Sequence, residues 1–186
     1  LIKHGADINA KNIYGDSALN AVALLGKPNS VQYLLYNDAV VQSKDNNGSS
    51  SFFAGILGGN VGVIALLLQY GANINEKVPS NGFNALHIVI CNDRMTYYDA
   101  EGDRQLLVQF LVSYGITINE QDNRGWTPLH YAVYRGKDEI VRILLEHGAD
   151  TTIKNNEEKT ALDLAQENNN TEILQVLENY KRTDLA

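Results

Sequence analysis

The side chains best suited to chemistry in this sequence are its four histidines and its one cysteine. His87 and His130 each end a short motif, NALH and TPLH, whereas His147 precedes a glycine and suits the negative end of a helix. No set of histidines and cysteines has the spacing of a zinc site, so we expect no metal ion. Cys91 has no sequence signal of an activating base, which favours a buried or half-buried thiol over a nucleophile.

Two further groups of residues suggest a ligand site, and neither pattern supports one. Asp99, Glu101 and Asp103 form an acidic cluster without the order of ligands in a calcium-binding loop, so a solvated loop is the better interpretation. The glycines of residues 55–62 do not form GxxxxGK[ST] and follow no predicted strand, as a phosphate cradle requires. We therefore predict no catalytic residue, no metal site and no cofactor.

Composition narrows the class of partner. The formal net charge of −7 argues against nucleic acid or an anionic membrane as the main partner. No apolar run approaches the roughly 20 residues that span a bilayer, so we expect no membrane insertion. A single cysteine allows no internal disulfide and suits a reducing compartment, which predicts an intracellular and cytoplasmic location.

The stretch that would position these residues is 122–150, which reads as two short helices with a turn at each end. Thr127 is suited to cap the first helix, and Pro128 fits its first position because proline lacks the N–H that is unpaired there. Gly136 and Gly148 are expected to end the two helices in the left-handed conformation. The second helix carries an apolar face at helical spacing, made of Ile140, Val141, Leu144 and Leu145. Such a unit cannot bury its own apolar faces and must stack on copies of itself.

Copies of this unit occur along the whole chain. GADIN, GANIN and GAD follow the expected second helices at Gly5, Gly71 and Gly148, and Gly15 lies 33 residues before Gly48. With these motifs the sequence resembles the ankyrin-repeat family. The resemblance implies an all-α solenoid of helix-turn-helix units with short hairpin loops. It also implies that the histidines of the NALH and TPLH motifs hydrogen-bond the backbone between adjacent hairpins. The opening LIKHGAD matches the end of a second helix, which predicts that the chain is a fragment of a longer ankyrin-repeat protein.

We take residues 1–186 as one ankyrin-repeat domain, and the 33-residue spacing divides it into successive repeats. The insertion in the third is read from the 43 residues between Gly82 and Gly125. The predicted ranges are 1–11, the end of a truncated repeat; 12–44, repeat one; 45–78, repeat two; 79–121, repeat three, with an insertion near 94–103; 122–154, repeat four; 155–180, a C-terminal capping repeat; and 181–186, a tail.

The first two repeats depart from the pattern at several positions. The helices of repeat one are expected at 17–25 and 31–36, with Pro28 between them. Asp38 replaces the usual turn glycine, which makes a left-handed turn there less favourable. In repeat two, Ser50 must cap its helix alone. Gly55, Gly58, Gly59 and Gly62 are each expected to cost up to about 1 kcal/mol relative to alanine.

The resemblance also implies a binding surface, since ankyrin repeats place their hairpin tips and first helices along one concave groove. Trp126, Tyr134 and Arg135 are its expected centre, because these residue types often dominate binding energy. Alternatively, Leu24 and Leu57 only pack on neighbouring repeats. Tyr97 and Tyr98 in the insertion are a second candidate, unless the insertion is only a drifted loop. The full predicted set is Tyr14, Asp16, Leu24, Leu25, Leu57, Phe83, Arg124, Trp126, Tyr134 and Arg135.

Together these features predict a non-catalytic scaffold that binds another protein or peptide in the groove. We expect a monomer that binds no nucleic acid and has no small-molecule substrate. One alternative is the targeting or regulatory arm of a larger enzyme or of a secreted bacterial effector acting in the host cytosol. Another is a clamp that covers a neighbouring domain of the same protein.

Overall fold

A computed structural model describes residues 5–92 and 101–183. These residues fall into two compact units, 5–80 and 81–92 with 101–183, and each is described by itself. The predicted insertion lies almost entirely outside the described residues, as do Tyr97 and Tyr98. Regular structure in the described part of the chain is all helical, as the sequence predicted. Two isolated bridges, Lys11 to Ser17 and Lys44 to Ser50, join the two sides of hairpin loops in the first unit.

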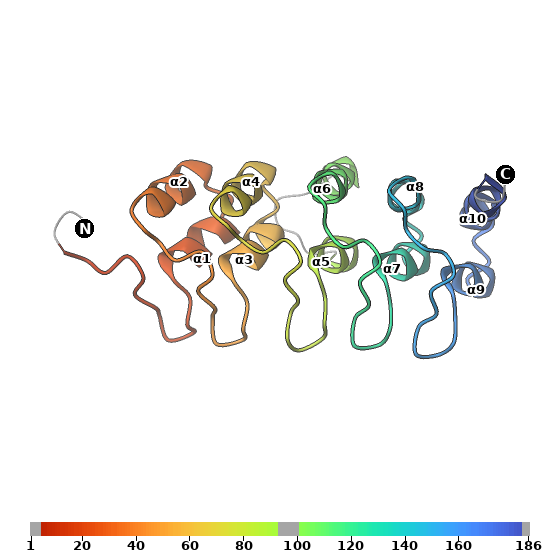
Figure 1. Ribbon diagram of the computed structural model, residues 1–186, viewed down its shortest axis with the longest axis horizontal. Coiled ribbons are helices and arrows are strands. Elements are labelled where there is room, and N and C mark those ends of the chain that lie inside the picture. The colour runs from red at the N-terminus through yellow and green to blue at the C-terminus, as the bar shows by residue number, and fades with distance from the viewer. Residues whose placement is uncertain (1–4, 93–100, 184–186) are drawn as a thin grey trace. The chain divides into compact units, whose positions relative to one another are not determined.

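The first unit holds two helix pairs in two layers. These are α1 (Ala18–Leu24) with α2 (Pro28–Tyr36), and α3 (Ser51–Gly58) with α4 (Val61–Gln69). Figure 1 shows α1 beside α3 in one layer and α2 beside α4 in the other, with the hairpin loops extending away from the helices. Pro28 is the first residue of α2 and not part of the connection, because its missing N–H costs nothing there.

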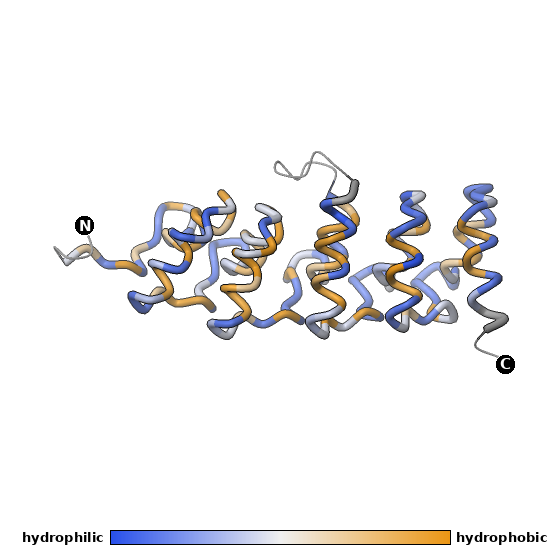
Figure 2. Tube along the Cα trace, turned by 90° about the horizontal axis from the view of Figure 1, so that it is seen from above, coloured by the Kyte–Doolittle hydropathy of each residue, from blue (hydrophilic) through white to orange (hydrophobic). Residues whose placement is uncertain are grey.

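The second unit repeats this arrangement with three pairs. Helices α5 (Ala85–Cys91), α7 (Pro128–Tyr134) and α9 (Ala161–Glu167) form one layer, and α6 (Glu101–Ser113), α8 (Asp138–Glu146) and α10 (Thr171–Thr183) form the other (Figure 1). Polar and apolar stretches alternate along the helices of both units (Figure 2). This pattern places one face of each helix against its neighbours.

Local signals in the sequence explain where most helices begin and end. Thr127 caps α7 and Pro128 follows it, as predicted. Gly136 and Gly148 take positive φ after α7 and α8, also as predicted. Asp38 adopts a φ of 65° in the corresponding turn after α2, so the left-handed turn forms there without glycine.

Ser50 is an exception among the caps. It occupies the N-cap position of α3, but its side chain makes no capping hydrogen bond. Its hydroxyl instead donates to Oε2 of Glu76 at 2.5 Å, and the other carboxylate oxygen of Glu76 pairs with Lys44. The prediction that Ser50 caps alone is therefore wrong, because its hydroxyl is turned toward the buried carboxylate of Glu76 in the next loop and accepts no backbone N–H of α3.

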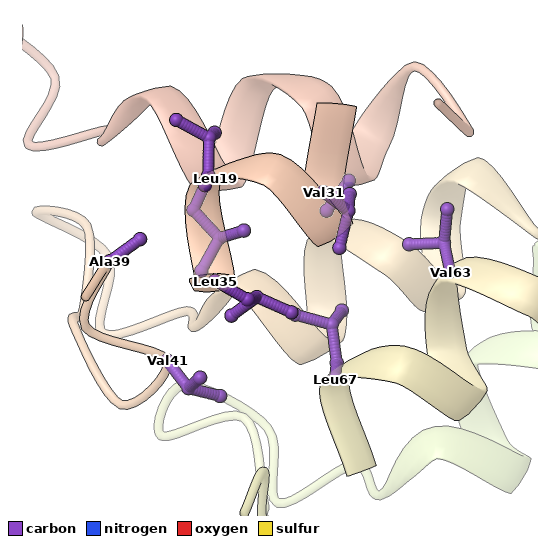
Figure 3. Packing of buried hydrophobic residues seen from close by; sticks show 9 residues of the cluster. Leu19, Val31, Leu35, Ala39, Val41, Val63 and Leu67 are labelled. Atoms are coloured by element: carbon purple, nitrogen blue, oxygen red, sulfur yellow. The ribbon is translucent and has the colours of Figure 1, made fainter. Parts of the chain in front are cut away.

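The core of the first unit lies between its two layers. Leu19 of α1, Val31 and Leu35 of α2, and Val63 and Leu67 of α4 pack into one cluster of buried side chains (Figure 3). In the second unit the predicted apolar face of α8 is buried in the same way, at Ile140, Val141, Leu144 and Leu145.

Truncating this core face should destabilise the second unit. Leu144 is fully buried, so Leu144→Ala is expected to lower the free energy of unfolding by about 2–5 kcal/mol, through lost burial and the remaining cavity. Leu106→Ala on α6 is the matched control, because that leucine is exposed. Urea denaturation followed by circular dichroism measures both. Equal losses in the two variants would contradict the assigned faces.

Candidate functional site

The hairpin loops within each unit are joined to one another by hydrogen bonds. In the first unit the Asn46 backbone N–H donates to the Tyr14 carbonyl at 3.0 Å, and in the second the Asn156 N–H donates to the Arg124 carbonyl at 3.0 Å. Glycine is required beneath these contacts, since a Cβ on Gly15 would lie 2.5 Å from the side-chain oxygen of Asn46. These contacts hold the loop tips in place within each unit.

The motif histidines have the structural role that the resemblance implied. In both capping boxes the ring Nδ1 accepts the N-cap backbone N–H, from Asn84 to His87 at 3.2 Å and from Thr127 to His130 at 3.1 Å. The opposite nitrogen lies 2.9 Å from the Trp126 carbonyl for His87. Since Nδ1 accepts, the proton is on Nε2, which donates to a carbonyl of the following hairpin. Both rings are buried, and their hydrogen bonds stabilise the fold.

Protonation of His130 should destabilise the second unit. Burial lowers the pKa of His130, and this outweighs the hydrogen bond to Lys159 and the charge of Asp122, which raise it. As pH falls below about 6.5, the unfolded chain gains a proton that the folded chain resists, so stability is lost with decreasing pH. The stability difference between wild type and His130→Gln should therefore shrink from pH 7.5 to pH 5.5 in urea denaturation. Parallel pH profiles for the two proteins would contradict this.

The first unit carries a hollow of about 760 Å³ between its hairpin loops and the helices α1 and α3. Three predicted residues, Asp16, Leu24 and Leu57, line it together. Leu24 and Leu57 are 44% and 38% exposed, so part of each side chain stays uncovered by the neighbouring repeats. Tyr14 and Leu25 are exposed as well, but they do not line this hollow.

The second unit carries a smaller hollow of about 340 Å³. Four predicted residues, Arg124, Trp126, Tyr134 and Arg135, line it together. Phe83 does not join them. It is half-buried, and its ring lies 5.2 Å from that of His87 and 5.4 Å from that of Tyr131.

Trp126 was predicted to be an exposed centre of the groove, and this expectation is wrong because its side chain is only 5% exposed. Its backbone N–H donates to the Asp122 carboxylate at 2.8 Å, which draws the residue inward. The indole packs against Tyr131 and Tyr134, and the guanidinium of Arg124 lies 5.1 Å over it. Tyr134, at 55% exposed, provides the exposed aromatic surface here.

Charged side chains surround the smaller hollow in an ion-pair network. Lys159 Nζ lies 2.8 Å from a Glu167 oxygen and 3.7 Å from a Glu157 oxygen. The Glu167 carboxylate raises the pKa of the Lys159 amine, so this cation stays charged. The network is exposed and contributes little to stability, and it leaves polar groups at the rim of the hollow.

Several lining residues of the larger hollow were not predicted from the sequence. Asn20, Ala18, Ala21, Ala54 and Asp45 all line it. The signal for Asn20 was visible, because SALN at 17–20 departs from the NALH and TPLH motifs at the histidine. The small alanines gave no such signal. Their small side chains leave space that larger ones would fill.

The described residues contain neither a metal-binding cluster nor a membrane-spanning helix. No group of three or more histidine, cysteine, aspartate or glutamate side chains is placed to hold a metal ion. No helix in the described ranges has the length and apolar character to cross a bilayer.

Comparison with known proteins agrees with this architecture. Residues 1–78 and 96–185 match a family model described as "Ankyrin repeats (3 copies)". The ankyrin repeat protein FPV031 of fowlpox virus is 37% identical over 120 residues, covering 62% of this chain and 32% of that protein. FPV219 of the same virus is 34% identical over 141 residues, again covering 32% of its length. The ankyrin repeat protein YahD of Escherichia coli is 26% identical over 93% of this chain and 84% of its own.

Proposed function

This chain belongs to the ankyrin-repeat family, and from that membership we propose that it is a non-catalytic scaffold that binds a partner polypeptide at the hollowed faces of its units. Ankyrin repeats are in general protein–protein interaction modules. The observation that carries the proposal is the larger hollow, where exposed leucines on α1 and α3 face a row of fixed loop tips. Exposed apolar side chains gathered in a concave site are typical of a partner surface.

Tyr134 with Arg124 and Arg135 is the corresponding patch on the second unit. Tyrosine and arginine are enriched among the residues that dominate binding energy. Trp126 supports this patch from beneath, because it holds Tyr134 edge-on with ring centroids 5.5 Å apart. The patch therefore depends on Trp126 for its shape, while the contacts come from its neighbours.

Partner capture from lysate of the source cells tests the proposal when it is compared between surface variants. Leu24→Ser with Leu57→Ser, and separately Tyr134→Ser, should each reduce capture of the same proteins about tenfold. Tyr33→Ser on α2 is the control, because Tyr33 is exposed and lines neither hollow. Capture that is unchanged in the hollow variants, or reduced equally by the control, would contradict the proposal.

A second candidate function is a binding arm within a longer protein. It is favoured by one observation, that the chain spans about a third of the length of the two fowlpox virus relatives. The same surface would then bring another part of that protein to its target. Comparing the partners captured by this chain with those captured by the longer protein distinguishes the two functions. An independent scaffold should capture the same partners when it is separated from the rest of the protein.

A further inference from the structure

The larger hollow occurs where the histidine of the repeat is replaced. His87 and His130 lie three residues after their N-cap residues, and each reaches a carbonyl of the following hairpin through Nε2. Asn20 occupies the same position in the first unit, three residues after the N-cap Ser17. An asparagine side chain is shorter than an imidazole and ends before the next hairpin.

Asn20 consequently has an unused hydrogen-bond donor. Its Oδ1 accepts from the Ser17 hydroxyl at 2.6 Å. Its Nδ2 has no hydrogen-bond partner within the described residues, and it is not one of the fully buried atoms that lack a partner, so it is open to the hollow. Asn20 lines the hollow together with Ser49 and Ser50 of the next hairpin, the segment that a histidine would have reached. An amide N–H that is open to the hollow can donate to a carbonyl of a ligand.

The lining of the hollow includes both exposed leucines and two aspartates. Leu24 and Leu57 contribute the exposed apolar surface. Asp16 and Asp45 lie among the lining residues, and no lysine or arginine of the described chain is within ion-pair distance of either. Lys11 also lines the hollow, but its ammonium donates a hydrogen bond to the Lys44 carbonyl. The hollow therefore presents two carboxylates without a paired cation.

We propose that this hollow binds an extended segment of a partner polypeptide in which a large apolar residue adjoins a lysine or arginine. The apolar side chain packs on Leu24 and Leu57, and the cation pairs with Asp16 and Asp45. Asn20 Nδ2 donates to a backbone carbonyl of the segment. The volume falls within the roughly 300–1,000 Å³ of ordinary ligand pockets. The assignment rests on the proposed scaffold function and specifies the partner at one of its surfaces.

A random decapeptide display library selected on the 186-residue chain tests the assignment. Enriched peptides are then synthesised with a fluorescent label, and their dissociation constants are measured by fluorescence anisotropy. We expect enrichment of lysine or arginine beside leucine, isoleucine or an aromatic residue. Asn20→His should weaken binding of these peptides about tenfold or more, because the imidazole fills the space and takes the carbonyl of the next hairpin.

Asn20→His and Asp45→Asn each introduce a residue that another repeat of this chain carries at the equivalent position. Asn20→His restores the residue of the other motifs, and its melting temperature, measured alongside, should not fall below wild type. Asp45→Asn, combined with Asp16→Asn, removes the charge while keeping the loop acceptor, since Asn155 holds two backbone N–H groups in the same way. This double variant should also bind about tenfold more weakly. Tyr33→Ser, which lines neither hollow, should leave the dissociation constants unchanged.

Selected peptides that lack basic residues, or whose affinity survives Asn20→His in the folded protein, would overturn the assignment. A library without any binder tighter than about 100 μM would overturn it as well. Neither result would contradict the proposed scaffold function. That function is tested separately, by the capture of whole proteins with surface variants of both units.

Discussion

Replacing Gly58 with alanine is expected to destabilise the first unit by about 3 kcal/mol. A Cβ at this position would lie 2.3 Å from the Leu24 carbonyl oxygen and 2.7 Å from that of Ala23. Both neighbours are backbone atoms at the end of α1, so relief requires α1 and α3 to move apart. The expectation that the glycines of α3 cost stability relative to alanine is therefore wrong for Gly58, where glycine permits the two helices to meet.

Gly62→Ala is the matched control on α4. Gly62 is exposed, and its added Cβ would meet only the Asn60 side chain at 3.2 Å. Alanine there should be neutral or stabilise by up to about 1 kcal/mol, because it restricts the unfolded chain. Urea denaturation of the two variants gives the comparison. A Gly58→Ala protein as stable as wild type would show that α1 and α3 do not pack as closely as described.

Asp122→Ala is expected to cost the second unit about 3–5 kcal/mol, by removing a buried acceptor that three donors use. One carboxylate oxygen accepts the Arg124 and Trp126 backbone N–H groups, at 2.9 and 2.8 Å. The other accepts the Tyr131 hydroxyl at 2.7 Å. With these bonds gone, the loop that holds Trp126 inward loses its anchor, and the Tyr134 patch loses its support.

Asp122→Asn separates the loop contacts from the charge. Its amide oxygen still accepts the two backbone N–H groups, as Asn155 does in its own hairpin, while the contact to Tyr131 changes. We expect a loss of about 1 kcal/mol, clearly smaller than for alanine. Near-ultraviolet circular dichroism of Trp126 reports whether the indole keeps its fixed environment. Equal losses in the alanine and asparagine variants would contradict the role of Asp122 as a loop anchor.

The helices could be predicted because their signals are local. Thr127, Pro128 and Gly136 fix one helix through capping, a preset φ and a left-handed end, all within ten residues. The histidine roles followed from the family resemblance, and the observed bonds agree with it. The hydrogen bond of Ser50 could not be predicted from local signals, because its partner Glu76 lies 26 residues away in another loop.

The binding surface could be predicted only in part. Leu24 and Leu57 were identified from their register on the first helices, and their exposure agrees with that register. The position of Trp126 within the repeat predicts an exposed residue at a loop tip. In the structure Arg124 covers the indole and Tyr131 packs against it. Burial at a loop tip depends on side chains from several elements, which the spacing of one repeat does not specify. For the same reason, the space left by Asn20 could not be foreseen as a hollow.

Site-specific photo-crosslinking is the most direct test of whether the hollowed faces bind a partner. A benzophenone amino acid is placed at Leu24 or Tyr134, and at Tyr33 of α2 as the reference, and the full chain is irradiated with its captured partner. Crosslinks to the same partner from Leu24 or Tyr134, with none from Tyr33, are the predicted result. A partner that crosslinks from Tyr33 and from neither hollow would contradict the proposed function.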